Sequence, residues 1–464
     1  GAANTNLTAL LVNSGATYQT GAFNQIVGSL AGSGTVTISS TYTLQAGADN
    51  TTTEFNGTFT GSLVKKGSGT LTLGGASNNT GTATVDAGTL VLNKASGSSD
   101  INAVAGLTIN TGGTVTISGA GAGQIANAAS VVVNSGALLD LNGHDLKFNQ
   151  LTGLGTITNT LAGTTSTLAI GYSSATFSFG GVATDGVANG GTPGGKLGLT
   201  KLGTGTLTLT AIQSYTGDTT VSAGTLAMAL ANQLSPATNV VVNSGGIWSL
   251  AGFNQRVGGI ASLSAGTINL GTATLDVGGN NSTTTYTGTI TGGGSLVKRG
   301  SGTLSLTGTA NYSGSTTVMA GTLSIGNGAA ATMLASTSVS ISGGAYFAFN
   351  TTTALTVADG LFSGAGQVII RNTGVITFNG GNSHSGGTLI DGGTVSLAAS
   401  ASTSNALGTG TLTISADATI KTVASSTAIV RAIANAVVLQ NNATLSINAN
   451  STNGTLTING AVTG

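Results

Sequence analysis

The acidic side chains of this sequence are few and widely spaced, which limits the acid–base chemistry that they could do. Among 464 residues there are 12 Asp and Glu, and the four candidate acids, Asp86, Asp140, Asp276 and Asp391, each stand alone. Polysaccharide lyases and hydrolases need carboxylates clustered in a cleft, either for acid–base catalysis or to hold calcium. We therefore expect each acid in a turn or on a strand exterior, where it accepts backbone N–H bonds.

The two histidines are equally isolated. His144 and His384 lie 240 residues apart, and the chain contains no cysteine. A Ser-His-Asp triad would need an imidazole beside both a hydroxyl and a carboxylate, whereas His144 and Asp145, as neighbours in a strand, would point to opposite faces. We expect both histidines on the surface. The sequence predicts no catalytic, cofactor-binding or metal-binding residue, and no cofactor.

Three lysines recur in one context, Leu-x-Lys-x-Gly. They are Lys65, Lys201 and Lys298. A row of such lysines could bind an anionic polysaccharide. The alternative is a structural corner lysine, whose aliphatic stem lies along apolar surface beside a tight glycine turn while its ammonium stays in water.

These lysines belong to an internal repeat with fixed spacing. Each is followed by Gly-Thr-Leu; a glycine comes ten residues after that Leu, and the Leu of an Ala-Gly-Thr-Leu comes 19 residues after it. The repeat positions are Gly69, Leu71, Gly81 and Leu90; Gly205, Leu207, Gly217 and Leu226; and Gly302, Leu304, Gly314 and Leu323. A degenerate fourth copy keeps both spacings through Ile376, Gly386 and Val395, but has Ile370 in place of the lysine. Modules are expected at about 9–120, 130–231, 240–330, 337–399 and 400–464 within one continuous solenoid over residues 1–464.

The elements that position these residues are short β-strands. Leu and Thr alternate in segments such as Gly69-Thr-Leu-Thr-Leu73, and the chain has 77 Gly and a single Glu, so the fold class is all-β. A 19-residue offset is too long for a hairpin but suits one coil of a β-solenoid, in which stacked coils bury a column of Leu, Val and Ile. We expect a single elongated rod of about 20–24 coils, roughly 100–115 Å long at ~4.8 Å per coil. The repeated lysines would then lie roughly 33 and 23 Å apart, too far for one small ligand to bridge, which favours the structural interpretation.

One aromatic position also has two interpretations. Three residues after the glycine of each Asn-Ser-Gly or similar turn come Tyr18, Leu139, Trp248 and Tyr346. If exposed, these residues would form a glycan-stacking ladder. Alternation in Leu138-Leu-Asp-Leu141 instead places Leu139 inward, so this position is predicted to be core.

The motif Gly-Ser-Leu-x-Lys-x-Gly-x-Gly-Thr-Leu-x-Leu, followed by Asn-Tyr-x-Gly-x-Thr-x-Val-x-Ala-Gly-Thr-Leu, resembles the autotransporter-associated β-strand repeat. The second half matches almost throughout at Asn311–Leu323 and at Ser214–Leu226. The resemblance implies a right-handed parallel β-helix passenger that is exported and either displayed on a bacterial surface or extracellular. It implies an adhesive or structural role and no single activity.

The predicted function is therefore a non-enzymatic, extracellular structural or adhesive β-solenoid. Two alternatives stay open: a subunit of a head-to-tail filament, and a polysaccharide-degrading β-helix enzyme. A net charge of zero excludes a nucleic-acid partner, and no apolar run reaches the ~20 residues that direct membrane insertion needs. Both ends fall within a module and carry no polar cap, so self-association or continuation of the same chain is expected there. Surface glycans are the other expected partner.

Overall fold

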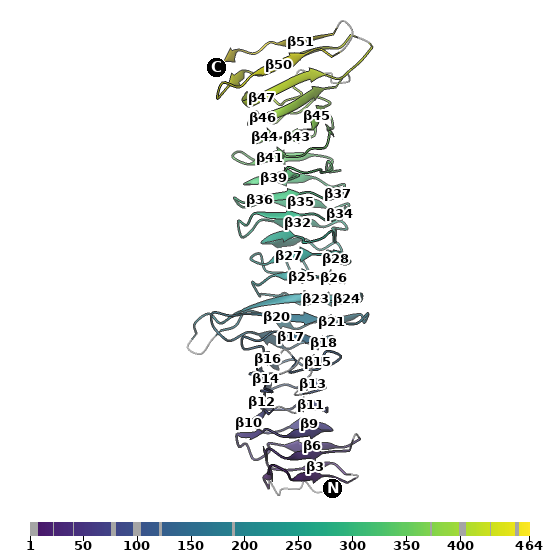
Figure 1. The fold of residues 1–464 in the computed structure, drawn as a ribbon, viewed down its shortest axis with the longest axis vertical. Coiled ribbons are helices and arrows are strands. Elements are labelled where there is room, and N and C mark those ends of the chain that lie inside the picture. The colour runs from purple at the N-terminus through teal and green to yellow at the C-terminus, as the bar shows by residue number, and fades with distance from the viewer. Residues whose placement is uncertain are drawn as a thin grey trace. The chain divides into compact units, whose positions relative to one another are not determined.

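The computed structural model is all-β. It describes residues 8–21, 23–39, 41–75, 80–95, 104–119, 123–187, 191–371, 374–398, 405–426, 428–450 and 454–464. Strand ladders in these segments are parallel, and no helix occurs in them. The chain divides into two compact units, Gly1–Ser235 and Pro236–Gly464. In both, short strands stack as successive turns (Figure 1), and the two units together contain about 20 turns. The predicted parallel β-solenoid is confirmed.

The strands of the first unit follow five ladder paths. They are β1 (Leu10–Val12), β4 (Leu30–Gly32), β7 (Thr53–Phe55), β10 (Thr70–Leu73), β12 (Gly88–Leu92), β14 (Gly113–Ile117), β16 (Leu138–Asp140), β19 (Thr156–Thr158) and β22 (Val182–Ala183); β3 (Gln25–Ile26), β6 (Thr43–Ala46), β9 (Ser62–Lys65), β11 (Thr82–Val85), β13 (Gly106–Ile109), β15 (Ser130–Val133) and β18 (Gln150–Gly153); β2 (Thr17–Gln19), β5 (Thr35–Thr37) and β8 (Thr58–Thr60); β17 (Leu146–Phe148), β20 (Thr165–Ile170), β23 (Lys196–Lys201) and β25 (Thr219–Val221); and β21 (Phe177–Phe179), β24 (Thr206–Leu209) and β26 (Gly224–Met228).

The strands of the second unit are arranged in the same manner. They are β27 (Asn239–Val242) and β30 (Gly259–Ala261); β28 (Gly246–Ser249), β31 (Thr267–Asn269), β34 (Thr289–Gly292) and β37 (Thr309–Tyr312); β29 (Gln255–Val257), β32 (Thr274–Val277), β35 (Ser295–Lys298), β38 (Thr316–Val318), β40 (Val339–Ile341) and β43 (Phe362–Ser363); β33 (Thr284–Tyr286), β36 (Thr303–Leu306), β39 (Thr322–Ile325), β41 (Tyr346–Phe349), β44 (Gln367–Ile370), β46 (Thr388–Leu397), β47 (Leu412–Thr422), β49 (Val437–Leu439) and β52 (Val462–Thr463), with β42 (Leu355–Val357), β45 (Val375–Phe378) and β50 (Leu445–Asn448) beside them; and β48 (Val430–Ile433) with β51 (Thr455–Ile458).

The 19-residue offset in the sequence is one turn of this stack. Leu71 pairs with Leu90, and the corresponding leucines of the next two copies pair in the same register, Leu207 with Leu226 and Leu304 with Leu323. All six side chains are buried, while the Thr residues that alternate with them are partly exposed. Period-two alternation therefore builds a continuous aliphatic column, as the residue types predict.

The aromatic register position is core at Leu139 and Trp248, whereas Tyr18 is only partly buried. Trp248 and Leu139 are fully buried, which confirms the prediction for both. Tyr346, however, is 38% exposed, because the count of three residues started from Gly343, which stands where the earlier turn has Ser244. Gly344, with φ +79°, occupies the left-handed position that Gly245 holds at φ +82°, so the true equivalent of Trp248 is Phe347, which is fully buried.

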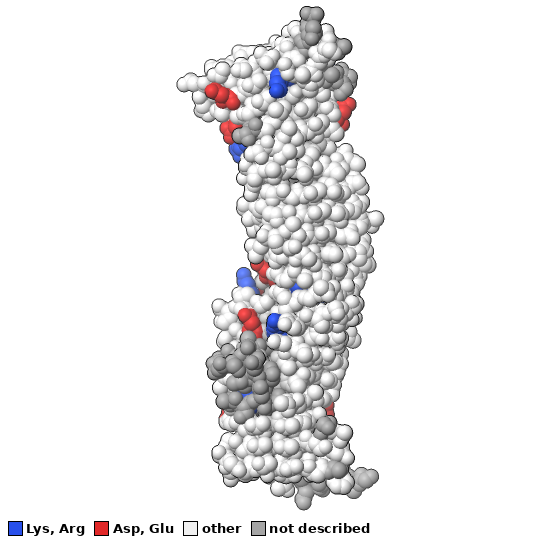
Figure 2. Space-filling model, turned by 45° about the vertical axis from the view of Figure 1, so that its right-hand side comes forward, with Lys and Arg blue, Asp and Glu red and all other residues white. Residues whose placement is uncertain are grey.

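The surface is sparsely charged. On the face drawn in Figure 2, Lys, Arg, Asp and Glu side chains are few and separated by uncharged surface. Within the described residues, no helix is long and apolar enough to cross a membrane.

Candidate functional site

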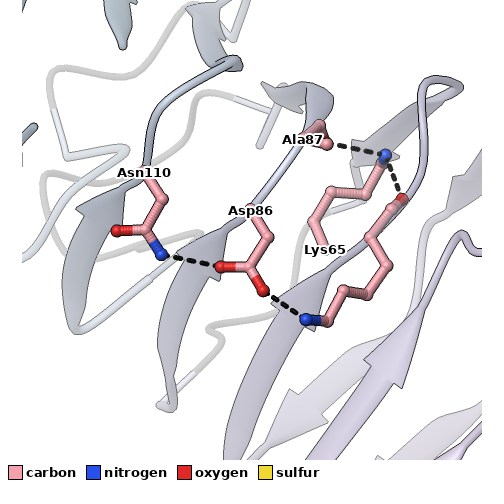
Figure 3. Close-up of polar contacts among 5 residues, drawn as sticks. Lys65, Asp86, Ala87 and Asn110 are labelled. Atoms are coloured by element: carbon pink, nitrogen blue, oxygen red, sulfur yellow. Dashed lines mark hydrogen bonds and ion pairs between the residues drawn. The ribbon is translucent and has the colours of Figure 1, made fainter. Parts of the chain in front are cut away.

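The corner formed by the Lys motif is the most regular polar feature of the repeat. Lys65 ends β9, and the chain turns through Lys66 and Gly67 before β10 begins. Strand alternation places Lys65 on the same inward face as Leu63, so its side chain has no exposed surface. Its ammonium donates to the carbonyl oxygens of Lys66 at 2.6 Å and Gly67 at 2.9 Å, and to that of Ala87 in the next turn at 3.3 Å. Figure 3 shows the bond to Ala87.

The same cage recurs in the other two complete copies. Lys201 Nζ donates to Leu202 O, to Gly203 O at 2.9 Å and to Ala223 O at 3.3 Å. Lys298 Nζ donates to Arg299 O at 2.5 Å, to Gly300 O at 2.9 Å and to Ala320 O at 3.2 Å. Each ammonium therefore joins the Lys-x-Gly corner of one turn to the Ala-Gly corner of the next.

These lysines do not place their ammonium groups in water, and the sequence-based interpretation is wrong on this point. Burial lowers the pKa of Lys201 and of Lys298 to about 8. Burial also lowers the pKa of Lys65, while the Asp49 carboxylate partly offsets it. A buried ammonium is tolerated because three backbone carbonyls replace part of its hydration. This arrangement removes the basic row that an anionic polysaccharide would need.

Glycine is required where these corners stack. Gly88 follows Ala87 with φ +65°, and a Cβ there would lie 2.5 Å from Gly67 O and 2.6 Å from Gly69 O. Gly81 has a similar constraint, since its Cβ would meet Gly61 O at 1.2 Å. Gly217 and Gly314 likewise approach the backbone of the preceding turn, with their Cβ positions 2.4 Å from Leu197 O and 2.2 Å from Gly294 O.

The fourth copy lacks the lysine, and the strand break is missing in its second turn. Ile370 occupies the motif position of Lys298 in the sequence and is fully buried. In the stack it pairs with Phe349, in the ladder that contains Ile325 and Leu306. The next turn does not break into two strands: β46 runs without interruption through Asp391, Gly392 and Gly393, and its register with β47 shifts between Ile390 and Asp391.

Three of the four singled-out acids form ion pairs rather than isolated turn contacts. Asp86 pairs with Lys66 one turn away, Asp276 Oδ2 lies 2.5 Å from Arg299 Nε, and Asp391 Oδ2 lies 2.8 Å from Arg371 Nε. These three acids keep the predicted turn or strand-exterior positions but pair with bases. Asp140 accepts the predicted N–H bonds, from Asn142 at 2.9 Å and Thr160 at 3.0 Å, although its side chain is buried. The length of one turn could have predicted two of these ion pairs, because Lys66 and Arg371 lie 20 residues before Asp86 and Asp391, which is about one turn of the solenoid.

The ion pair of Asp86 extends into a ladder along the exterior. Asn110 Nδ2 donates to Asp86 Oδ1 at 2.7 Å, and Asn134 Nδ2 donates to Asn110 Oδ1 at 2.8 Å (Figure 3 shows the first of these bonds). Burial would raise the pKa of Asp86, but the hydrogen bonds from Lys66 and Asn110 outweigh it and hold the pKa below its ordinary value.

His384 is not on the surface, contrary to the prediction. It is fully buried, its Nε2 lies 3.0 Å from Thr388 Oγ1, and burial lowers its pKa to about 4. Two tyrosines of the complete repeats make the same contact, with Tyr215 to Thr219 at 2.6 Å and Tyr312 to Thr316 at 2.7 Å. His384 thus replaces the buried Tyr of Tyr-x-Gly-x-Thr. His144 is half-buried in the turn after β16.

Sequence reasoning also missed a fourth buried lysine. Lys94 has no exposed surface, its Nζ donates to Gly57 O at 3.3 Å, and burial lowers its pKa to about 8. The signal was alternation, since Lys94 continues the inward face of Leu90 and Leu92.

Within the described segments, no group of three or more His, Cys, Asp or Glu could hold a metal ion. The lysines and ion pairs described here connect the corners and exteriors of adjacent turns.

Comparisons with known proteins agree with this geometry. A family model described as the passenger-associated-transport-repeat matches residues 63–92, 199–228, 296–325 and 371–397. The first three matches each contain one lysine cage and one stacked Leu pair. The chain is also similar to a protein described as adhesin BmaC autotransporter, from Brucella suis biovar 1 (strain 1330), at 45% identity over 130 residues. That match spans 27% of this chain and 4% of the relative.

Proposed function

Because this chain is a β-helical repeat protein of the autotransporter-passenger type, we propose that it is a non-enzymatic adhesive and structural segment of a bacterial surface protein. Passenger-associated-transport repeats are typical of exported proteins displayed at the cell surface. The relative is described as an adhesin, which supports an adhesive role for this chain.

One structural observation carries the proposal. Each recurrent ionisable group of the repeat is engaged in holding the solenoid: the lysines cap corner carbonyls, and the exterior acids pair with bases in adjacent turns. A glycoside-cleaving enzyme needs two carboxyl groups facing one sugar ring, about 5–10 Å apart. The acids that sequence reasoning singled out lie in separate turns and are committed to other partners.

The test uses the whole 464-residue chain attached to fluorescent beads. We expect these beads to adhere to epithelial monolayers several-fold above albumin-coated beads. We also expect no new reducing ends when the soluble chain is incubated with neutral and acidic polysaccharides. Adherence equal to the albumin control would overturn the adhesive role. Polysaccharide cleavage that Asp140→Asn or Asp276→Asn abolishes would favour the enzyme alternative.

A further inference from the structure

A polar depression lies where the fourth repeat loses its corner. Its volume is about 350 Å³, and its lining includes Asn350, Thr352, Arg371, Asp391, Gly392 and Gly393. Asn350 follows β41, Arg371 follows β44 and Asp391 lies in β46, and the strand registers place these three residues at one position in three successive turns. Where the lysine is present, the equivalent corner is occupied by the ammonium and its carbonyl partners.

The charged pair in the depression is held in place. Arg371 Nε donates to Asp391 Oδ2 at 2.8 Å, and Ser415 Oγ donates to Asp391 Oδ1 at 2.9 Å. The hydrogen bonds from Ser415 and Arg371 hold the pKa of Asp391 below its ordinary value, so the carboxylate stays ionised. Both side chains reach solvent, with 52% of Arg371 and 37% of Asp391 exposed.

Hydrogen-bonding capacity remains beside this pair. Within the described residues, the two terminal nitrogens of Arg371, the side-chain amide of Asn350 and the hydroxyl of Thr352 have no protein partner. The floor carries no side chain at Gly392 and Gly393, whose φ values of +98° and +96° favour glycine. A flat polar ligand can therefore approach the backbone of β46.

The balance of charge selects the ligand class. An anion drawn to Arg371 would be repelled by Asp391, and a cation drawn to Asp391 would be repelled by Arg371. A neutral ligand with vicinal hydroxyls uses both groups, since each hydroxyl can donate to the carboxylate and accept from the guanidinium. We propose that this depression binds a neutral saccharide unit. This inference rests on the proposed adhesive function and deepens it by naming the class of ligand that one site binds.

The test is saturation-transfer NMR and calorimetry on the full chain, with an array of neutral monosaccharides and disaccharides as probes. Glucuronate and inorganic sulfate serve as anionic probes. We expect at least one neutral sugar to bind, with Kd in the millimolar range, because the site is shallow. Arg371→Gln and Asp391→Asn should each weaken that binding at least tenfold.

Two further variants keep the result interpretable. Thr352→Tyr fills the depression from an exposed position and should abolish binding even if Arg371→Gln disturbs folding. Lys66→Gln changes the equivalent ion pair at a closed corner and should leave the Kd unchanged. Binding of no neutral sugar, tighter binding of glucuronate or sulfate, or full binding by Thr352→Tyr would overturn the proposal. A chain that binds sugar but does not adhere to cells would overturn only the adhesive function.

Discussion

Replacing one corner lysine by a neutral residue of similar length tests the cage directly. In Lys298→Met the side chain still fills its inward position, but the carbonyl oxygens of Arg299, Gly300 and Ala320 lose their ammonium donor. The substitution therefore separates hydrogen bonding from packing.

The expected cost follows from two opposing effects. Leaving three buried carbonyls without a partner costs about 2 kcal/mol each, or about 6 kcal/mol in all. Removing the buried charge is favourable: burial lowers the lysine pKa from 10.5 to about 8, which corresponds to about 3 kcal/mol at neutral pH. The net destabilisation at pH 7 is then about 3 kcal/mol. In a repeat protein it should stay near the affected turns.

Amide hydrogen exchange followed by mass spectrometry reads this local effect. Peptides covering β35, β36, β38 and β39 should exchange about 100-fold faster in Lys298→Met, since about 1.4 kcal/mol corresponds to tenfold. Lys196→Met, at an exposed position, is the matched control and should change exchange less than about twofold. Unchanged or slower exchange in Lys298→Met would refute the reasoning, because it would mean that relief of charge burial outweighs the lost hydrogen bonds.

Three further predictions use other buried groups. The pKa of Lys201 is about 8 in the folded chain and 10.5 in the unfolded chain, so the unfolded state binds more protons between these pH values. The free energy of unfolding, measured by chemical denaturation, should therefore rise from pH 8 towards pH 10. The pKa of His384 is about 4 in the folded chain against 6.5 in the unfolded chain, so the folded state should lose stability as pH falls from 6.5 to 4. His384→Tyr should abolish this pH dependence, measured by hydrogen exchange of β46. Trp248 should emit at blue-shifted wavelengths with little iodide quenching, and Trp248→Ala should cost about 3–5 kcal/mol within its own turns, measured by exchange.

The architecture was predictable because two sequence signals report directly on geometry. The fixed offset between Leu71 and Leu90 is one turn, so it gives the stacking register without knowledge of the turns between. Alternation then decides which face is core, and it does so correctly for Leu139 and Trp248. Both signals are local and repeated, which is why degenerate copies do not hide them.

The lysine cage was not predicted, although alternation already placed Lys65 on the face of Leu63. An isolated buried ammonium is so costly that a solvent-exposed head is the reasonable expectation from sequence alone. What reverses that expectation is the convergence of three carbonyls, one of which belongs to the next turn. Backbone groups leave no trace in residue types, so only the structure reveals them.

The remaining errors come from register between turns. Asp276 and Arg299 pair across 23 residues, whereas Asp391 and Arg371 pair across 20, so a pairing rule needs the exact length of each turn. Gly343 replaces Ser244 in a turn of equal length, so counting from Gly343 instead of Gly344 selects Tyr346 in place of Phe347.

The fourth repeat shows which features of the turn persist where the lysine is absent. The turn after Ile370 keeps the leucine-type column, with Ile376 and Val395 in register, so hydrophobic stacking alone does not produce the corner. In the next turn the backbone pairs with β47 as one continuous strand, without the break seen in the complete copies. In this copy the loss of the lysine coincides with the loss of the strand break one turn later, where Ala87 and Ala320 accept the ammonium in complete copies. The polar recess lies beside this continuous strand, and the side chains of Phe349, Ile370 and Ile390 beneath it stay fully buried.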